Sequence, residues 1–239
     1  MKNLFFSISA IAMLGLAACN NSGYKTTSAS TNTGITKVNN TETDITSEFK
    51  PFDVMEANIT VKDYATWEKA FDMDSLYRKD NGLELIVIGR NNANPNNLLI
   101  AFSAEDVQKA KAFTAEPKLK DLMNKSGVIS KPDFNYFNVI RFNADSKEKQ
   151  WVLVTHKVKN FDEWLKVFDA EGTATRASFG LIDVVLSRGV DDPNIVHLVF
   201  DIKDMAKAKA RMKDPALKKI MMDGGVVGEP KIEFYTSAE

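Results

Sequence analysis

The chain has 239 residues, of which 44% are hydrophobic and 10% aromatic, and its formal net charge is −1. This composition is sufficient for a packed core, and the length fits one large domain or two small ones. Acidic and basic residues are interspersed without the basic patch typical of nucleic-acid binding, so we expect no nucleic-acid partner.

The first eighteen residues have the form of a processing signal. Lys2 supplies a positive charge, an apolar run follows over residues 4–16, and Leu16-Ala17-Ala18 leads into Cys19. The run is shorter than the roughly 20 apolar residues of a membrane-spanning helix. Cys19 is also the only cysteine in the sequence, so we expect no disulfide, thiolate metal site or cysteine nucleophile in the exported domain.

This pattern resembles the lipobox of bacterial lipoproteins. The resemblance implies that residues 1–18 are a signal peptide and that Cys19 carries the lipid, which would hold the protein on a membrane of the cell envelope. In enteric bacteria an aspartate after the cysteine favours the inner membrane; because Asn20 stands there, the outer membrane is favoured over the inner one. The alternative is an ordinary secretory signal with an accidental cysteine.

Residues 19–50 are rich in Ser, Thr and Asn and contain few large apolar side chains. Such a segment buries too little apolar surface to offset the entropy lost on ordering. We therefore predict a flexible tether before the folded part.

The folded part contains an internal repeat. The segment Val61-Lys-Asp-Tyr-Ala-Thr-Trp-Glu-Lys-Ala-Phe-Asp72 recurs 97 residues later as Val158-Lys-Asn-Phe-Asp-Glu-Trp-Leu-Lys-Val-Phe-Asp169. Turn residues recur with the apolar ones, as in the pairs Gly82/Gly180 and Pro117/Pro215, so the copies should share one fold. We predict a first repeat over residues 51–145 and a second over residues 150–239.

Each repeat is predicted to contain a strand, a helix, two strands, a helix and a strand. Tyr64, Trp67 and Phe71 recur at helical spacing, and the flanking apolar runs have the length and composition of strands. The second helices should begin near Ser103 and Asp201. The predicted strands are residues 54–61, 83–89, 98–102 and 134–142, then 151–158, 181–186, 195–200 and 231–235.

This β-α-β-β-α-β order is the ferredoxin-like arrangement, an α+β fold whose sheet leaves one face uncovered. With a Trp- and Phe-bearing first helix and a Lys/Ala-rich second helix, it resembles the dimeric α+β barrel superfamily, which includes antibiotic biosynthesis monooxygenases. The resemblance implies an intramolecular barrel formed by both repeats of one chain. Because members differ in activity, the fold does not assign a function.

Strand parity indicates which side chains face the space between the sheets. On the first strand, Glu56 and Asn58 point away from the apolar face that should meet the helices. The equivalent positions in the second repeat are Leu153 and Thr155, so the two halves differ in polarity there. His197 has the opposite parity to the apolar face of its strand and could project into the same space.

Arg90 and Arg188 are repeated polar residues at strand ends. They either recognise an anion or are ordinary charges beside polar loops. His156 lies on the helix-facing side and is expected to be a hydrogen-bonded core or edge residue. Neither predicted second helix contains the histidine that ligates haem in haem-degrading relatives, and we predict no cofactor and no metal site.

Two functions fit these observations. The first is a lipid-anchored cell-envelope protein that binds a small apolar or amphipathic ligand, or a partner, between the sheets. The candidate ligand-binding residues are Glu56, Asn58, Arg90, Thr155, Arg188 and His197. The alternative is a cofactor-independent, monooxygenase-like enzyme of the barrel superfamily. No catalytic residue or oligomeric state follows from the sequence.

Overall fold

The computed structural model describes residues 49–238, which belong to one compact unit. The predicted signal peptide, Cys19 and the tether up to residue 48 lie outside the described residues. Within residues 49–238, the helices are too short and too polar to cross a membrane.

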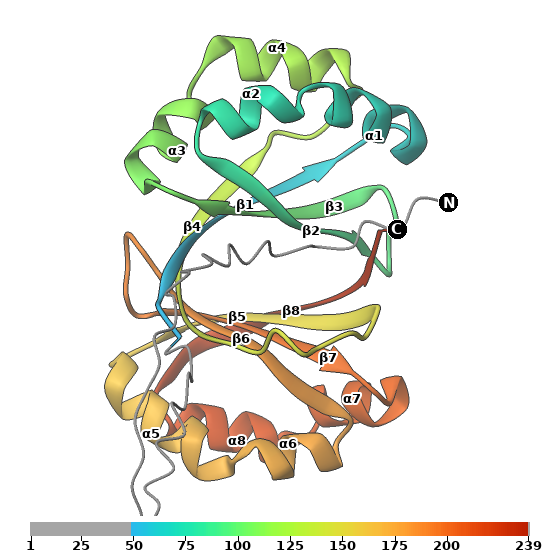
Figure 1. Ribbon diagram of the computed structural model, residues 1–239. Coiled ribbons are helices and arrows are strands. Elements are labelled where there is room, and N and C mark those ends of the chain that lie inside the picture. The colour runs from blue at the N-terminus through green and yellow to red at the C-terminus, as the bar shows by residue number, and fades with distance from the viewer. Residues whose placement is uncertain (1–48, 239) are drawn as a thin grey trace, which may run out of the picture. The chain divides into compact units, whose positions relative to one another are not determined.

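Each repeat contributes four strands and four helices (Figure 1). The first repeat contains β1 (Phe52–Thr60), α1 (Tyr64–Met73), α2 (Ser75–Asp80), β2 (Leu83–Asn91), β3 (Asn97–Ala104), α3 (Val107–Thr114), α4 (Pro117–Lys125) and β4 (Asp133–Phe142). The second contains β5 (Gln150–Val158), α5 (Phe161–Glu171), α6 (Thr173–Ser178), β6 (Leu181–Gly189), β7 (Ile195–Ile202), α7 (Met205–Met212), α8 (Pro215–Asp223) and β8 (Val226–Ser237).

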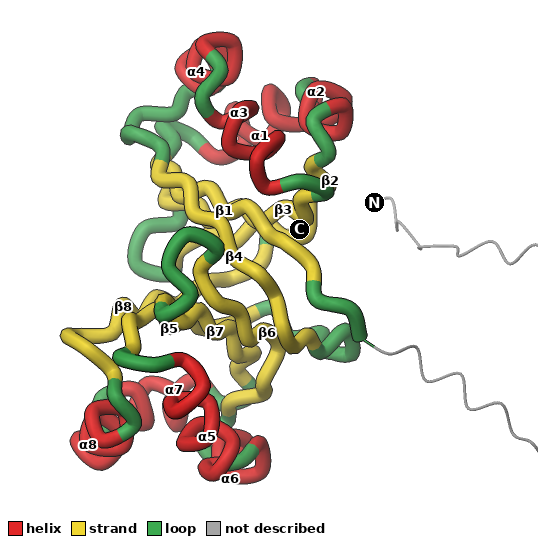
Figure 2. The backbone as a smooth tube through the Cα atoms, turned by 90° about the vertical axis from the view of Figure 1, so that its left-hand side faces the viewer, coloured by secondary structure: helices red, strands yellow, loops and turns green. Residues whose placement is uncertain are grey.

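The strands form a closed barrel in the order β1-β3-β2-β8-β5-β7-β6-β4. Each repeat supplies one half of the barrel, and the halves join where β2 pairs with β8 and β4 pairs with β6. The helices form two layers outside the barrel, one over each half, in both views (Figures 1 and 2). The predicted α+β fold, with two ferredoxin-like repeats in one intramolecular barrel, is confirmed.

The first helix of each repeat begins at a side-chain cap. The carboxylate of Asp63 accepts a hydrogen bond from the Thr66 backbone N–H (2.8 Å), and the Asn160 side chain accepts one from the Glu163 N–H (3.0 Å). Such caps satisfy backbone donors that have no partner inside the helix. Trp67 is buried on the inner face of α1, as its spacing predicts.

The second helices begin later than expected. Side chains of Asp106 and Asp204 cap α3 and α7, whereas Ser103 and Asp201 belong to the preceding strands β3 and β7. The predicted starts were wrong because strand pairing continues past both residues, as the pair Leu83 and Ala104 shows. New helices begin at the repeated prolines, Pro117 of α4 and Pro215 of α8.

The seams between the halves are short. β2 and β8 share three residue pairs, from Gly89 with Ser237 to Asn91 with Tyr235. The register also shifts around Ile86 in β2 and around Val184 in β6. Such β-bulges bend a strand and interrupt regular pairing. β2 pairs with β8 only at its far end, so the first half of β2 makes no ladder with β8.

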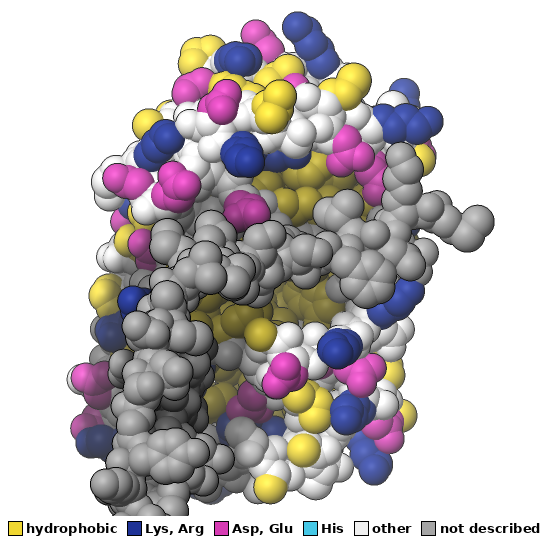
Figure 3. All heavy atoms as spheres, in the orientation of Figure 1, with side chains coloured by type: hydrophobic (Ala, Val, Ile, Leu, Met, Phe, Trp, Pro, Cys, Tyr) yellow, Lys and Arg dark blue, Asp and Glu magenta, His cyan; other side chains and the backbone are white. Residues whose placement is uncertain are grey.

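Three clusters of apolar residues form the core. One lies between helices and sheet in each repeat, and the third fills part of the barrel interior. Inside the barrel, the rings of Trp151 and Tyr235 stack with centroids 4.6 Å apart. Gly89 lies beside them, and a Cβ at that position would be 2.3 Å from the Trp151 ring. In the space-filling view, hydrophobic side chains gather in the hollow between the two helical ends, whereas the ends themselves carry charged and hydrophobic side chains together (Figure 3).

Candidate functional site

A buried hydrogen-bonded pair connects the two repeats inside the barrel. Oε1 of Glu56, on β1, lies 2.9 Å from Nε2 of His197, on β7. The exposed fractions of the two side chains are 8% and 3%. The Phe137 ring stacks on the imidazole with centroids 4.0 Å apart. Both side chains therefore face the interior of the barrel, as the strand parity predicts.

The second nitrogen of His197 is also engaged. Nδ1 lies 2.9 Å from the Thr155 hydroxyl, and the Ser187 hydroxyl donates to the His197 backbone carbonyl (3.1 Å). A neutral imidazole satisfies both contacts if Nε2 donates to Glu56 and Nδ1 accepts from Thr155, and an imidazolium satisfies them by donating to both. The arrangement therefore holds a proton between His197 and Glu56 in either state.

An apolar cavity of about 240 Å³ lies on one side of this pair. Phe52, Phe137, Phe142 and Trp151 supply aromatic rings, and the remaining wall is mainly aliphatic. At the bulged end of the barrel, Ile86 and Phe142 line the cavity and are 45% and 42% exposed. Exposed apolar side chains at such a place form a mouth through which an apolar molecule can enter.

A polar cavity of about 320 Å³ lies on the other side of the pair. Glu56 and His197 line both cavities and therefore stand between them. Asn58 and Thr155 line only the polar one, together with Asp133, Lys231 and Glu233. Four sequence-predicted residues thus meet inside the barrel, although Asn58 and Thr155 do not line the apolar cavity.

Asp201 is a buried carboxylate that the sequence analysis assigned to a helix start. It lines the apolar cavity and accepts hydrogen bonds from the Ser146 hydroxyl and from the Glu148 backbone N–H (3.0 Å). Burial raises the pKa of Asp201, although these two hydrogen bonds oppose the shift. The signal that could have found it was parity, because Asp201 follows His197 by four residues along one strand.

Arg90 and Arg188 do not join the site. The Arg90 guanidinium lies 4.3 Å from the centre of the Tyr64 ring and donates to the carbonyl of Pro95 (3.0 Å). Arg188 makes the equivalent contacts with Phe161 and Pro193. Both arginines therefore tie a strand-connecting loop to the first helix of their repeat, outside the barrel interior.

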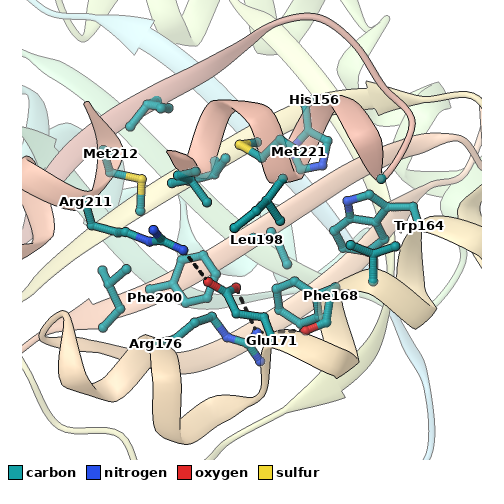
Figure 4. Close-up of a pocket in the computed structure, with 17 residues that line it drawn as sticks. His156, Trp164, Phe168, Glu171, Arg176, Leu198, Phe200, Arg211, Met212 and Met221 are labelled. Carbon is teal, nitrogen blue, oxygen red and sulfur yellow. Dashed lines mark hydrogen bonds and ion pairs between the residues drawn. The ribbon is translucent and has the colours of Figure 1, made fainter. Parts of the chain in front are cut away.

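A further cavity of about 70 Å³ lies between the helices and the sheet of the second repeat (Figure 4). His156 points into it beside Trp164, and a buried ion cluster of Glu171, Arg176 and Arg211 lies at its other side. Within residues 49–238, neither ring nitrogen of His156 has a hydrogen-bond partner. His156 is buried as expected, but the expected hydrogen bond is absent. Burial lowers its pKa to about 4.

The barrel interior is the better candidate for function. A cavity of about 60 Å³ occupies the corresponding place in the first repeat, so the helix-side space belongs to the packing of the repeat itself. The apolar barrel cavity is more than three times larger and is lined by a hydrogen-bonded pair to which both repeats contribute. Function is expected where the copies differ, because shared features are explained by the duplicated fold.

No protein-family model and no curated protein matches this sequence. Similar solved structures include a proposed monooxygenase from Lactobacillus acidophilus, with 14% identity and a TM-score of 0.52 over 79% of this chain and 94% of that one. An anthrone oxidase-like protein has 13% identity and a TM-score of 0.53, covering 81% and 93%. A proposed chlorite dismutase has 12% identity and a TM-score of 0.51, covering 80% and 96%. These likenesses show the fold, that of the dimeric α+β barrel proteins.

Proposed function

We propose that the protein binds a small, mainly apolar molecule with one polar group in the apolar cavity of the barrel. The observation that carries this proposal is the cavity of about 240 Å³ that ends at the buried Glu56–His197 pair. An engineered apolar cavity of about 150 Å³ in another protein binds benzene. The present cavity therefore has room for an aromatic ring with a short substituent, whose polar group would meet Glu56.

To test the proposal, the cavity is filled by a substitution in the first repeat that introduces the larger residue found at the equivalent position of the second. Val54 lines the cavity, and its equivalent in the second repeat is Trp151. Native mass spectrometry of the purified full chain should show a co-purified small molecule, and Val54→Trp should lose it. Val54→Leu, a smaller change, should retain part of it. A wild-type chain with no bound molecule, and no uptake of added small aromatic compounds, would contradict the proposal.

We also propose that the folded part is held on a membrane of the cell envelope, with the outer membrane favoured. Support comes from Leu16-Ala17-Ala18-Cys19 and from the polar segment that follows. Replacing Cys19 with Ser should move the protein from the membrane fraction to the soluble fraction of cells. If the variant stays with the membranes, this anchor is wrong.

A cofactor-independent, monooxygenase-like activity is a second candidate. The Glu56–His197 pair favours it, because a buried acid/base pair beside an apolar cavity can take a proton from a bound phenol or enol. Oxygen uptake on a panel of quinols and anthrones tests it. Activity should disappear in Glu56→Gln while ligand binding survives, and no uptake by the wild type would exclude it for those substrates.

A further inference from the structure

Most of the ionisable residues that line the apolar cavity are acids. Three ionisable acids line it, namely Glu56, Glu148 and Asp201, and no lysine or arginine does so among residues 49–238. Counted over the whole residue, the exposed fractions of Glu56 and Asp201 are 6% and 5%. Glu148, in contrast, is exposed at the surface. A ligand inside this cavity therefore meets the carboxyl oxygens of these acids, and the one basic side chain of residues 49–238 that lines the cavity is His197, which Glu56 engages.

Glu56 has an acceptor oxygen to offer. Its Oε1 is engaged with His197, while Oε2 has no hydrogen bond from any residue in the described part of the chain. A carboxylate oxygen accepts more than one hydrogen bond, so Oε2 can accept one from a donor group on a ligand. Asp201 accepts from Ser146 and Glu148 through Oδ2, and no donor within residues 49–238 reaches Oδ1.

The aromatic walls favour the same kind of ligand. Phe137 and Trp151 face the cavity from opposite halves of the barrel, and Phe52 and Phe142 pack edge to face, with centroids 6.0 Å apart. The faces of aromatic rings attract cations, and Trp does so most strongly. The ammonium group of an organic amine binds both carboxylates and the faces of aromatic rings. The hydrocarbon part of the same molecule would fill the apolar space.

We propose that the ligand of the barrel cavity is a small aromatic or aliphatic amine, whose ammonium group binds Glu56 and whose hydrocarbon part lies among the aromatic rings. This inference rests on the proposed ligand-binding function and narrows it to one chemical class. A carboxylate ligand would meet the carboxyl groups of Glu56 and Asp201, and no lysine or arginine of residues 49–238 lines the cavity to pair with it.

Three probes of nearly equal size test the class, because each carries a different polar group on the same ring. We suggest isothermal titration calorimetry of the purified full chain at pH 7.5 with 2-phenylethylamine, 2-phenylethanol and phenylacetate. Charge-assisted hydrogen bonds are roughly twice as strong as neutral ones, so the amine should bind about tenfold more tightly than the alcohol. Phenylacetate should give no saturable heat.

Matched substitutions locate the ammonium group. Glu56→Gln should weaken amine binding about tenfold and bring it to the level of the alcohol, while alcohol binding changes little. Glu229→Gln removes an exposed carboxylate that pairs with Lys218 outside the cavity, and it should leave all three affinities unchanged.

The outcomes separate this inference from the function on which it rests. If the alcohol binds as tightly as the amine, or if phenylacetate binds best, the cavity binds ligands but the amine class is wrong. If none of the three probes binds, the binding function fails and the amine class fails with it. The comparison of probes on the wild-type chain decides the matter even if Glu56→Gln does not fold.

Discussion

The two repeats make the same side-chain contacts outside the barrel, but they place different side chains inside it. Outside, Arg90 and Arg188 make equivalent contacts with an aromatic ring and a proline carbonyl. Inside, Glu56 corresponds to Leu153, and His197 corresponds to Leu99. Each repeat thus contributes one polar residue where the other has leucine. The fold needs the shared contacts, whereas the differences create a buried hydrogen-bonded pair that belongs to neither repeat alone.

The apolar interior shows the same contrast. Trp151 stacks on Tyr235 over Gly89, which has no side chain to obstruct it. The residues equivalent to Trp151 and Tyr235 are Val54 and Phe137 of the first repeat, and the residue equivalent to Gly89 is Ser187 of the second; all three line the apolar cavity. A tryptophan therefore fills the space in one half, and a valine leaves it open in the other. Unequal filling of two equivalent places explains why the cavity lies to one side of the interior.

The largest expected effect concerns His156, which corresponds to Ile59. Its pKa of about 4 lies below the ordinary value of 6.5, because burial disfavours the charged imidazole. Between pH 6.5 and 4 the unfolded chain binds the proton more readily, so this residue should lower the free energy of unfolding by roughly 3 kcal/mol as the pH falls through that window. His156→Ile should remove that part of the pH dependence, measured by urea unfolding at several pH values.

The reciprocal change sharpens the comparison. Ile59→His should add a similar loss of stability on acidification, because Ile59 is 2% exposed in the same place of the first repeat. Other groups titrate in this range, so each variant is compared with the wild type at each pH. Equal pH dependence in His156→Ile and in the wild type would contradict the expectation.

Gly89→Ala tests the packing of the filled half. The new methyl group would stand 2.3 Å from the Trp151 ring, so the indole must move from its place against Tyr235. Overpacking of this kind costs about 1–3 kcal/mol. Urea unfolding should show the loss. Ser187→Ala at the equivalent position removes one hydrogen bond to the His197 carbonyl and should cost about 1 kcal/mol. A larger loss for Ser187→Ala than for Gly89→Ala would refute this account.

A double-mutant cycle tests the Glu56–His197 pair. Glu56→Leu leaves Nε2 of His197 without its acceptor, and His197→Leu leaves a buried carboxylate without its donor, each costing about 1–3 kcal/mol. The double variant has leucine at both positions, as the other repeat has at the equivalent positions, Leu153 and Leu99. We expect the double variant to be more stable than the sum of the single losses predicts, by about 1–2 kcal/mol. Simple additivity in urea unfolding would show that the two side chains do not interact.

The smallest effects are expected where the repeats are alike. Arg90→Gln and Arg188→Gln each lose a contact with an aromatic ring, worth about 0.5–1 kcal/mol at a partly exposed site. The two losses should be similar and additive in thermal unfolding, and ligand binding should not change. A large loss of binding in either variant would return that arginine to the candidate site.

Strand parity and helical spacing predicted much of this molecule. The period-two pattern of β1 was enough to turn Glu56 inward, and the three- and four-residue spacing around Trp67 placed α1 on its sheet. Asp201 was missed because an acidic residue shortly before a helix resembles a cap, and local sequence does not show that strand pairing continues past it. The unpaired state of His156 was missed for a related reason, since burial without a partner depends on side chains from distant helices.

The repeat, the order of its elements and the polarity difference between the two first strands follow from the sequence by itself, because they depend on local periodicity and on comparison of the copies. The meeting of Glu56 with His197 and the cavity beside them were decided only by the tertiary structure. These residues are 141 positions apart, and only closure of the barrel brings their strands face to face. The cavity likewise depends on how valine and tryptophan at equivalent positions fill one shared interior.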